Sequence, residues 1–161
     1  MTCVWLITSF NFYLIQFLIN KFEQVYTTAI LNSISEILGI ISGGIMYNNL
    51  RVRGSLFLSY TFAFTGSVLI LTYGLHHQES VIFPVLVLIA KFGVSSAFNI
   101  LYISHVDVFP VLFATTALGI CNFISRIFTS MSPVLAQMEE PLPIVIFLGL
   151  SMVGSSIVWG I

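Results

Sequence analysis

Three charged side chains, Glu36, Lys91 and Arg126, lie deep inside long runs of apolar residues. If these runs are helices in a lipid bilayer, each charge costs roughly 2.5–3.5 kcal/mol near the helix centre. The cost falls when opposite charges pair, when a basic side chain reaches the interface, or when the charges face water. We predict that Glu36 and Arg126 lie close enough to interact. The functional interpretation is that all three charges face an aqueous pathway for a polar solute.

Polar residues extend these charges along one face of four apolar runs. One of these faces carries Lys91, Ser95, Asn99 and Tyr102. Steps of four, four and three residues keep them on one side of a helix. The other stripes are Asn32, Glu36, Gly39 and Gly43, then Asn122, Arg126, Thr129 and Pro133, and finally Asn11 with Gln16. Four striped helices are what a hydrated cavity requires, and Gly39 with Gly43 also predicts the close approach of a neighbouring helix.

The composition is strongly apolar. Of the 161 residues, 58% are hydrophobic and 7% are charged, whereas a soluble domain is usually about a quarter charged. The apolar runs approach the ~20 residues that a helix needs to cross ~30 Å of hydrocarbon. They lie at about 3–20, 27–47, 55–74, 80–104, 114–135 and 142–161. The sequence therefore predicts an all-α, polytopic membrane bundle of six transmembrane helices in a single domain, residues 1–161.

The expected connections between these helices are short and polar. They hold Lys21 and Glu23, then Asn48, Asn49, Arg51 and Arg53, then His76, His77 and Glu79, and finally Glu139, Glu140, Pro141 and Pro143. An even number of spans puts both termini on one face, together with the loop of Arg51 and Arg53. Because basic loops favour the cytoplasmic side, we expect both termini to be cytoplasmic.

A six-residue pattern occurs twice in the chain. Residues 32–37 read NSISEI and residues 122–127 read NFISRI. These segments lie in the middle helices of two successive triplets, which cross the membrane in opposite directions. Although short matches in apolar sequence also arise by chance, this placement is the one that an inverted three-plus-three repeat requires.

Other classes of function find little support in the sequence. The net charge of −1 leaves no basic stripe for nucleic acid. The chain has no paired nucleophile and base, no glycine loop for phosphate and no metal-ligand spacing, so we expect no enzyme, metal or cofactor. Cys3 and Cys121 fall inside predicted helices and are expected to be buried thiols.

The fourth and fifth runs carry a family resemblance. Residues 90–102 read AKFGVSSAFNILY, residues 107–110 read DVFP, residues 116–119 read TALG, and Ser125 and Arg126 follow. In order and spacing through Pro133 this stretch resembles the organic ion transporter branch of the major facilitator superfamily, which includes cation, anion and carnitine carriers. The resemblance implies the C-terminal six-helix half of such a carrier, its spans corresponding to the family's seventh to twelfth helices.

This resemblance implies a function and a set of site residues. It implies transport of a small organic solute by alternating access, in the plasma membrane, with the missing N-terminal half or a partner bundle completing a twelve-span carrier. The alternative is a truncated or non-transporting six-span protein that acts as an interaction subunit. The expected substrate-binding residues are Glu36, Lys91, Asn99, Tyr102 and Arg126, and the expected gating residues are Arg51, Arg53 and Asp107.

The chain departs from the family pattern near the gating residues. Residues 48–53 read NNLRVR, without the acid and the glycine that the family places in this loop. Val111–Ala114 replaces the family's Thr-x-x-Arg, so the arginine that would pair with Asp107 is absent.

Overall fold

The computed structural model describes residues 2–19, 25–74, 82–139 and 141–160, and in these ranges every regular element is a helix. The elements are α1 (Thr2–Ile19), α2 (Val25–Leu69), the π-helical turn η1 (Ile70–Gly74), α3 (Ile82–Val108), α4 (Val111–Thr129), α5 (Ser132–Ala136) and α6 (Leu142–Gly160). The all-α prediction is confirmed for this part of the chain. Lys21, Glu23, His76, His77, Glu79 and Glu140, which the sequence placed in loops, lie outside the described residues.

Helix α2 is 45 residues long and contains a break. A straight helix of this length would measure roughly 68 Å, about twice the thickness of the hydrocarbon core. The backbone of Arg51 has φ 57° and ψ −175°, which ends one helical segment and begins another. A non-glycine residue with such a φ is uncommon because its Cβ crowds the backbone. We call residues 25–50 the first segment of α2 and residues 52–69 the second segment.

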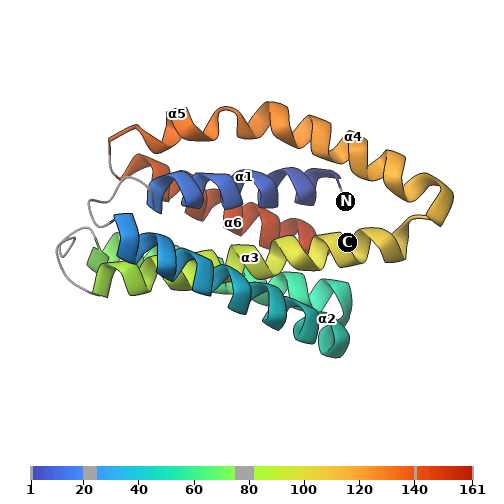
Figure 1. Ribbon diagram of the computed structural model, residues 1–161, viewed down its shortest axis with the longest axis horizontal. Coiled ribbons are helices and arrows are strands. Elements are labelled where there is room, and N and C mark those ends of the chain that lie inside the picture. The colour runs from blue at the N-terminus through green and yellow to red at the C-terminus, as the bar shows by residue number, and fades with distance from the viewer. Residues whose placement is uncertain (1, 20–24, 75–81, 140, 161) are drawn as a thin grey trace.

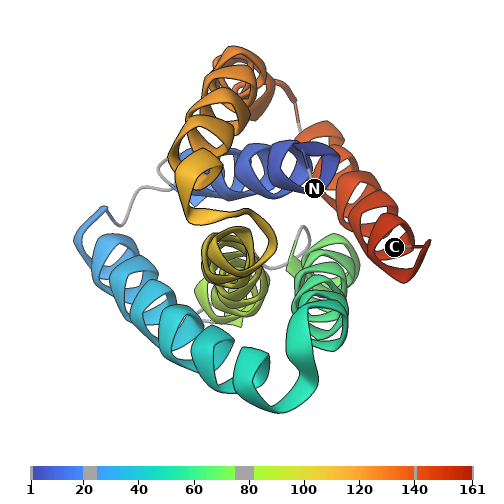
Figure 2. The same cartoon turned by 90° about the vertical axis from the view of Figure 1, so that its right-hand side faces the viewer.

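The two segments run in opposite directions beside α3. In the first segment Ser35 donates to the carbonyl of Leu88 over 3.0 Å, and twelve residues later Tyr47 donates to Asp107. The residue numbers increase in the same direction along both helices, so the first segment is parallel to α3. In the second segment Gly66 lies against Ala90, while the preceding Ala63 lies against Gly93. Along these contacts the residue numbers of α2 rise while those of α3 fall, so the second segment is antiparallel to α3. The chain therefore reverses at Arg51, and Figure 2 shows the turn within α2.

Helix α3 lies at the centre of the bundle. It packs against both segments of α2 on one side and against α1 on the other, and α1 also contacts α4, α5 and α6 (Figure 2). Two groups of buried side chains fill the space between these helices. One includes Leu14, Leu18, Ala90, Val94 and Phe147. The other includes Val4, Trp5, Tyr60, Ala97 and Ile100.

Small residues set the distance between α2 and α3. A Cβ built on Gly39 would lie 2.7 Å from the Cβ of Ser95, and one built on Gly43 would lie 3.0 Å from the carbonyl oxygen of Ser96. The predicted close approach at Gly39 and Gly43 is therefore confirmed, and the neighbour is α3. Such contacts let helices pack without a hydrophobic driving force in lipid.

Five helices in the described part of the chain are long and apolar enough to cross a membrane. These stretches are Thr2–Ile19, Asn32–Tyr73, Val85–Val108, Leu112–Ala136 and Leu142–Gly160. The sequence predicted six runs, and the second and third of them both fall in α2. The expected fifth run, 114–135, is divided between α4 and α5 at Ser130 and Met131. The cause is Pro133, which has no N–H to bond the carbonyl of Thr129.

One end of the bundle gathers the first and last described residues with the break at Arg51 (Figure 1). The rings of Phe57, shortly after Arg51, and Trp159, near the end of α6, have centroids 5.6 Å apart. The connection between α3 and α4 lies at the same end of the molecule in Figure 1. The side of a membrane that this end would face stays a prediction.

Candidate functional site

Lys91 is a fully buried cation in the middle of α3. Its side chain is 0% exposed. The ammonium group donates a hydrogen bond to Oε1 of Gln16 and lies 3.8 Å from the centroid of the Phe12 ring, both on α1. Glu36, on the first segment of α2, supplies the attracting negative charge. Two neighbouring helices, α1 and α2, thus supply this ammonium with an amide oxygen, a ring face and a carboxylate charge.

Arg126 lies apart from that group, on α4. Its side chain is exposed, and the guanidinium carbon is 4.9 Å from the centroid of the Tyr13 ring on α1. The predicted contact between Glu36 and Arg126 is not found in the described part of the chain, where the charge of Glu36 acts on Lys91. The physical reason is the order of packing, because α4 contacts α1 while the first segment of α2 packs on α3.

A row of aromatic rings from α1 and α3 continues from Lys91. Phe12 stacks on Phe98 with centroids 5.0 Å apart. Tyr102 meets Phe98 at 5.1 Å and Trp5 at 4.8 Å, both edge to face. Such geometries suit aromatic pairs, and the faces of these rings attract cations. Of these four rings, only that of Tyr102 was predicted from the sequence to bind substrate.

Two signals in the sequence are compatible with the aromatic row. Trp5 and Phe12 are seven residues apart on α1, and Phe98 and Tyr102 are four apart on α3, so each pair shares a helix face. With 15 phenylalanines in the chain, however, such spacing also describes ordinary core packing.

Asn99 takes part in the contact between α3 and the first segment of α2. Its amide nitrogen donates to the carbonyl of Ile40 over 2.8 Å, next to a hydrogen bond from Ser96 to the carbonyl of Gly39 over 2.9 Å. Two buried oxygens on this side of the bundle have no hydrogen-bond partner among the described residues, Oγ of Ser95 and Oδ1 of Asn32. Because most buried polar groups are paired, unpartnered acceptors beside a polar stripe favour a binding role.

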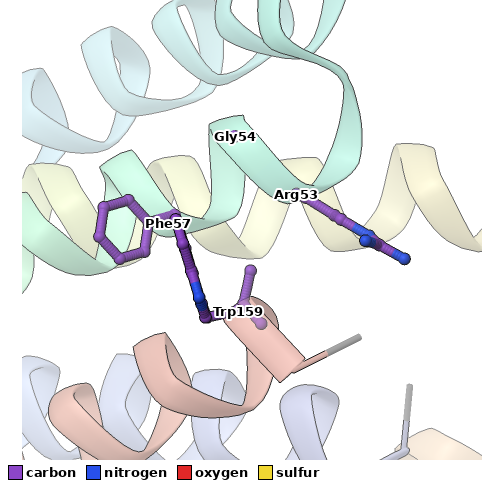
Figure 3. A pocket seen from close by; sticks show the side chains of 5 residues that line it. Arg53, Gly54, Phe57 and Trp159 are labelled. Carbon is purple, nitrogen blue, oxygen red and sulfur yellow. The ribbon is translucent and has the colours of Figure 1, made fainter.

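The residues expected to form a gate lie near one end of the bundle but in different surroundings. Asp107 accepts a hydrogen bond from the hydroxyl of Tyr47, which joins the ends of α3 and the first segment of α2. Arg51 is exposed at the break. Arg53 lines a pocket of about 240 Å³ between the second segment of α2 and α6, shown in Figure 3. The other walls are Gly54, Phe57, Val158 and Trp159.

Cysteine and metal chemistry find no support in the described residues. No group of three or more His, Cys, Asp or Glu residues there could hold a metal ion. Cys121 is buried as expected, but Cys3 is exposed, although the next two residues, Val4 and Trp5, are buried, so it lies on an uncovered side of α1.

The chain matches no protein-family model. It is similar to a solute carrier. Solute carrier family 22 member 4 of Mus musculus is 24% identical over 131 residues, which cover 81% of this chain and 23% of that protein. The chain thus spans about a quarter of the length of the relative it matches. Together with five helices able to cross a membrane, the similarity supports an integral membrane protein related to transporters.

Proposed function

We propose that the chain forms one six-helix half of a facilitator-type carrier that moves a small organic ion by alternating access. In this proposal α2 crosses the bilayer twice, reversing at Arg51, and α4 with α5 forms one crossing. The six crossings are two inverted triplets, whose middle helices carry Glu36 and Arg126. The similarity to a solute carrier over 81% of the chain supports this reading.

The observation that carries the proposal is the charged and aromatic face built by α1, the first segment of α2, α3 and α4. A charge buried at this depth in a membrane bundle is costly, and such residues commonly mark a solute pathway. The half-buried rings of Phe12 and Phe98 and the exposed guanidinium of Arg126 offer both stacking and charge to a solute. The proposed substrate-binding residues are Glu36, Lys91, Asn99, Tyr102 and Arg126, as the sequence indicated.

The exposure of α4 supports a missing partner bundle. Only 17% of the apolar stretch of Leu112–Ala136 is buried, against 61% for Val85–Val108. Large apolar side chains such as Leu112 and Phe123 are 88% and 69% exposed. Lipid could cover them, but a helix that also carries Arg126 is better covered by a second bundle that shares a hydrated site. The same face would serve an interaction subunit, the second candidate function.

Uptake measurements separate the two candidates. The chain is joined to the N-terminal six-span half of a related carrier and reconstituted in liposomes, with each half alone as control. We expect saturable uptake of an organic ion only by the joined protein, because alternating access needs two bundles. Stable assembly of the halves without uptake of anionic, zwitterionic or cationic solutes would instead favour the interaction subunit.

The proposed topology places both termini and Arg51 in the cytoplasm of cells that carry the protein in the plasma membrane. After Cys3 and Cys121 are replaced by alanine, single cysteines are introduced at Arg51 and at Glu139, both exposed. We expect an impermeant thiol reagent added outside intact cells to label the Glu139→Cys variant and not the Arg51→Cys variant. Permeabilisation should expose both. Labelling of Arg51→Cys alone in intact cells would reverse the topology.

A further inference from the structure

The surroundings of Lys91 are a complete binding site for a primary ammonium group. The nitrogen lies 3.8 Å from the centroid of the Phe12 ring and donates to Oε1 of Gln16. Glu36 adds a negative charge. A ring face, a neutral oxygen and a carboxylate are the three groups that recognise an ammonium ion in water-poor surroundings. This site is filled by a side chain of the protein itself, since Lys91 is 0% exposed.

Two unused acceptors lie one helical turn from the charged residues of this site. Ser95 is one helical turn beyond Lys91, is 2% exposed, and its Oγ has no partner in the described part of the chain. Asn32 is one turn before Glu36, and its Oδ1 is likewise buried and unpartnered. The spacing of four residues puts each on the same helix face as its charged neighbour. Two spare oxygen acceptors therefore lie on the helix faces that carry Lys91 and Glu36.

We propose that Lys91 determines specificity, acting as a tethered cation that occupies this site and excludes cationic solutes from it. A second positive charge close to the ammonium is repelled strongly where the effective dielectric constant is low. A cationic solute that reaches this face is therefore kept out of the site. The charge exposed to the solute on α4 is that of Arg126. This inference rests on the proposed function, because it assumes that solutes reach the face.

Chemical rescue tests the site without measuring transport. The change Lys91→Ala removes a fragment equal in shape and charge to n-propylammonium and leaves Phe12, Gln16 and Glu36 in place. In lipid nanodiscs, n-propylammonium well above its Kd should raise the Tm of this variant by roughly 4 °C. The neutral isostere 1-propanol should not raise it. The parent chain should show no shift with either compound, because Lys91 already fills the site.

Matched variants keep the test decisive. Adding Phe12→Leu to Lys91→Ala should reduce the shift, because the ring face is lost. Lys91→Met keeps the stem and most of the volume, so it serves where the alanine variant does not fold. In Lys91→Met the ammonium ion, and not Na⁺ or n-propylammonium, should raise the Tm, since room remains for the nitrogen alone.

The outcomes distinguish this inference from the proposed function. Equal shifts with 1-propanol, a shift in the parent chain, or no shift in either Lys91 variant would overturn the ammonium site. In the joined carrier, uptake of a cationic solute should be at least tenfold higher in Lys91→Ala than in the parent, and n-propylammonium should inhibit this added uptake. Rescue without this inhibition would leave an ammonium site that does not set specificity. Absence of uptake by the joined parent would overturn the proposed function and leave the rescue result standing.

Discussion

Replacing Gly93 with alanine is expected to destabilise the bundle. A Cβ at this position would lie 2.4 Å from the backbone nitrogen of Ala63 and 2.7 Å from the carbonyl oxygen of Ser59. Both are backbone atoms, so no side chain can rotate away, and α3 must move from the second segment of α2. Overpacking of this kind costs about 1–3 kcal/mol. The gain in helix propensity from glycine to alanine is about 1 kcal/mol and does not offset a cost at the upper end of that range.

The matched control is Gly44→Ala on α2, where an added Cβ meets no atom within 4 Å. This change should leave the Tm unchanged or raise it, because only the propensity term remains. Thermal unfolding of both variants in the same detergent compares the two effects. Gly93→Val should lower the Tm further than Gly93→Ala. Equal stability of the Gly93→Ala and Gly44→Ala variants would show that the two helices separate without loss of packing.

Hydropathy predicted the helices well because lipid demands long apolar runs with internally bonded backbones. It placed α1 at 3–20 and α6 at 142–161, close to the observed Thr2–Ile19 and Leu142–Gly160. Breaks within a run were harder to place. Pro133 lay inside an expected helix that the structure divides. The reversal at Arg51, in contrast, falls within the connection expected between the second and third runs, although the helix resumes there with no intervening coil.

The sequence predicted candidate site residues by type but did not predict their partners. A polar stripe shows which face of a helix avoids lipid, and this placed Glu36, Lys91 and Arg126 on inward faces. It does not show which helix lies opposite. Glu36 was therefore assigned to Arg126, whereas packing of the first α2 segment on α3 brings it to Lys91. Gln16 was recognised as polar, but its hydrogen bond to Lys91 depends on the register of α1 against α3.

Changing Arg126 to aspartate is expected to lower uptake of a carboxylate-bearing solute by the joined carrier at least tenfold. The guanidinium is permanently charged and presents a planar fork of donors that matches a carboxylate. It is exposed at the face of α4 and supported by the Tyr13 ring at 4.9 Å, so it need not break an ion pair to bind a solute. A change of two charge units replaces this attraction with repulsion, and each 1.4 kcal/mol lost is a factor of ten in affinity.

The change Arg126→Asp should alter the uptake of an anionic, a zwitterionic and a cationic solute of similar size in different directions. Uptake of the anion should fall most and uptake of the zwitterion should fall less. Uptake of the cation should stay the same or rise. Arg126→Lys keeps the charge but loses the two-pronged geometry, so it should fall between the parent and Arg126→Asp for the anion. Because Lys91 remains in place in these variants, the cation gain should be small unless Lys91→Ala is added. Cation uptake that dominates in the parent and stays the same in Arg126→Asp would show that Arg126 does not select charge.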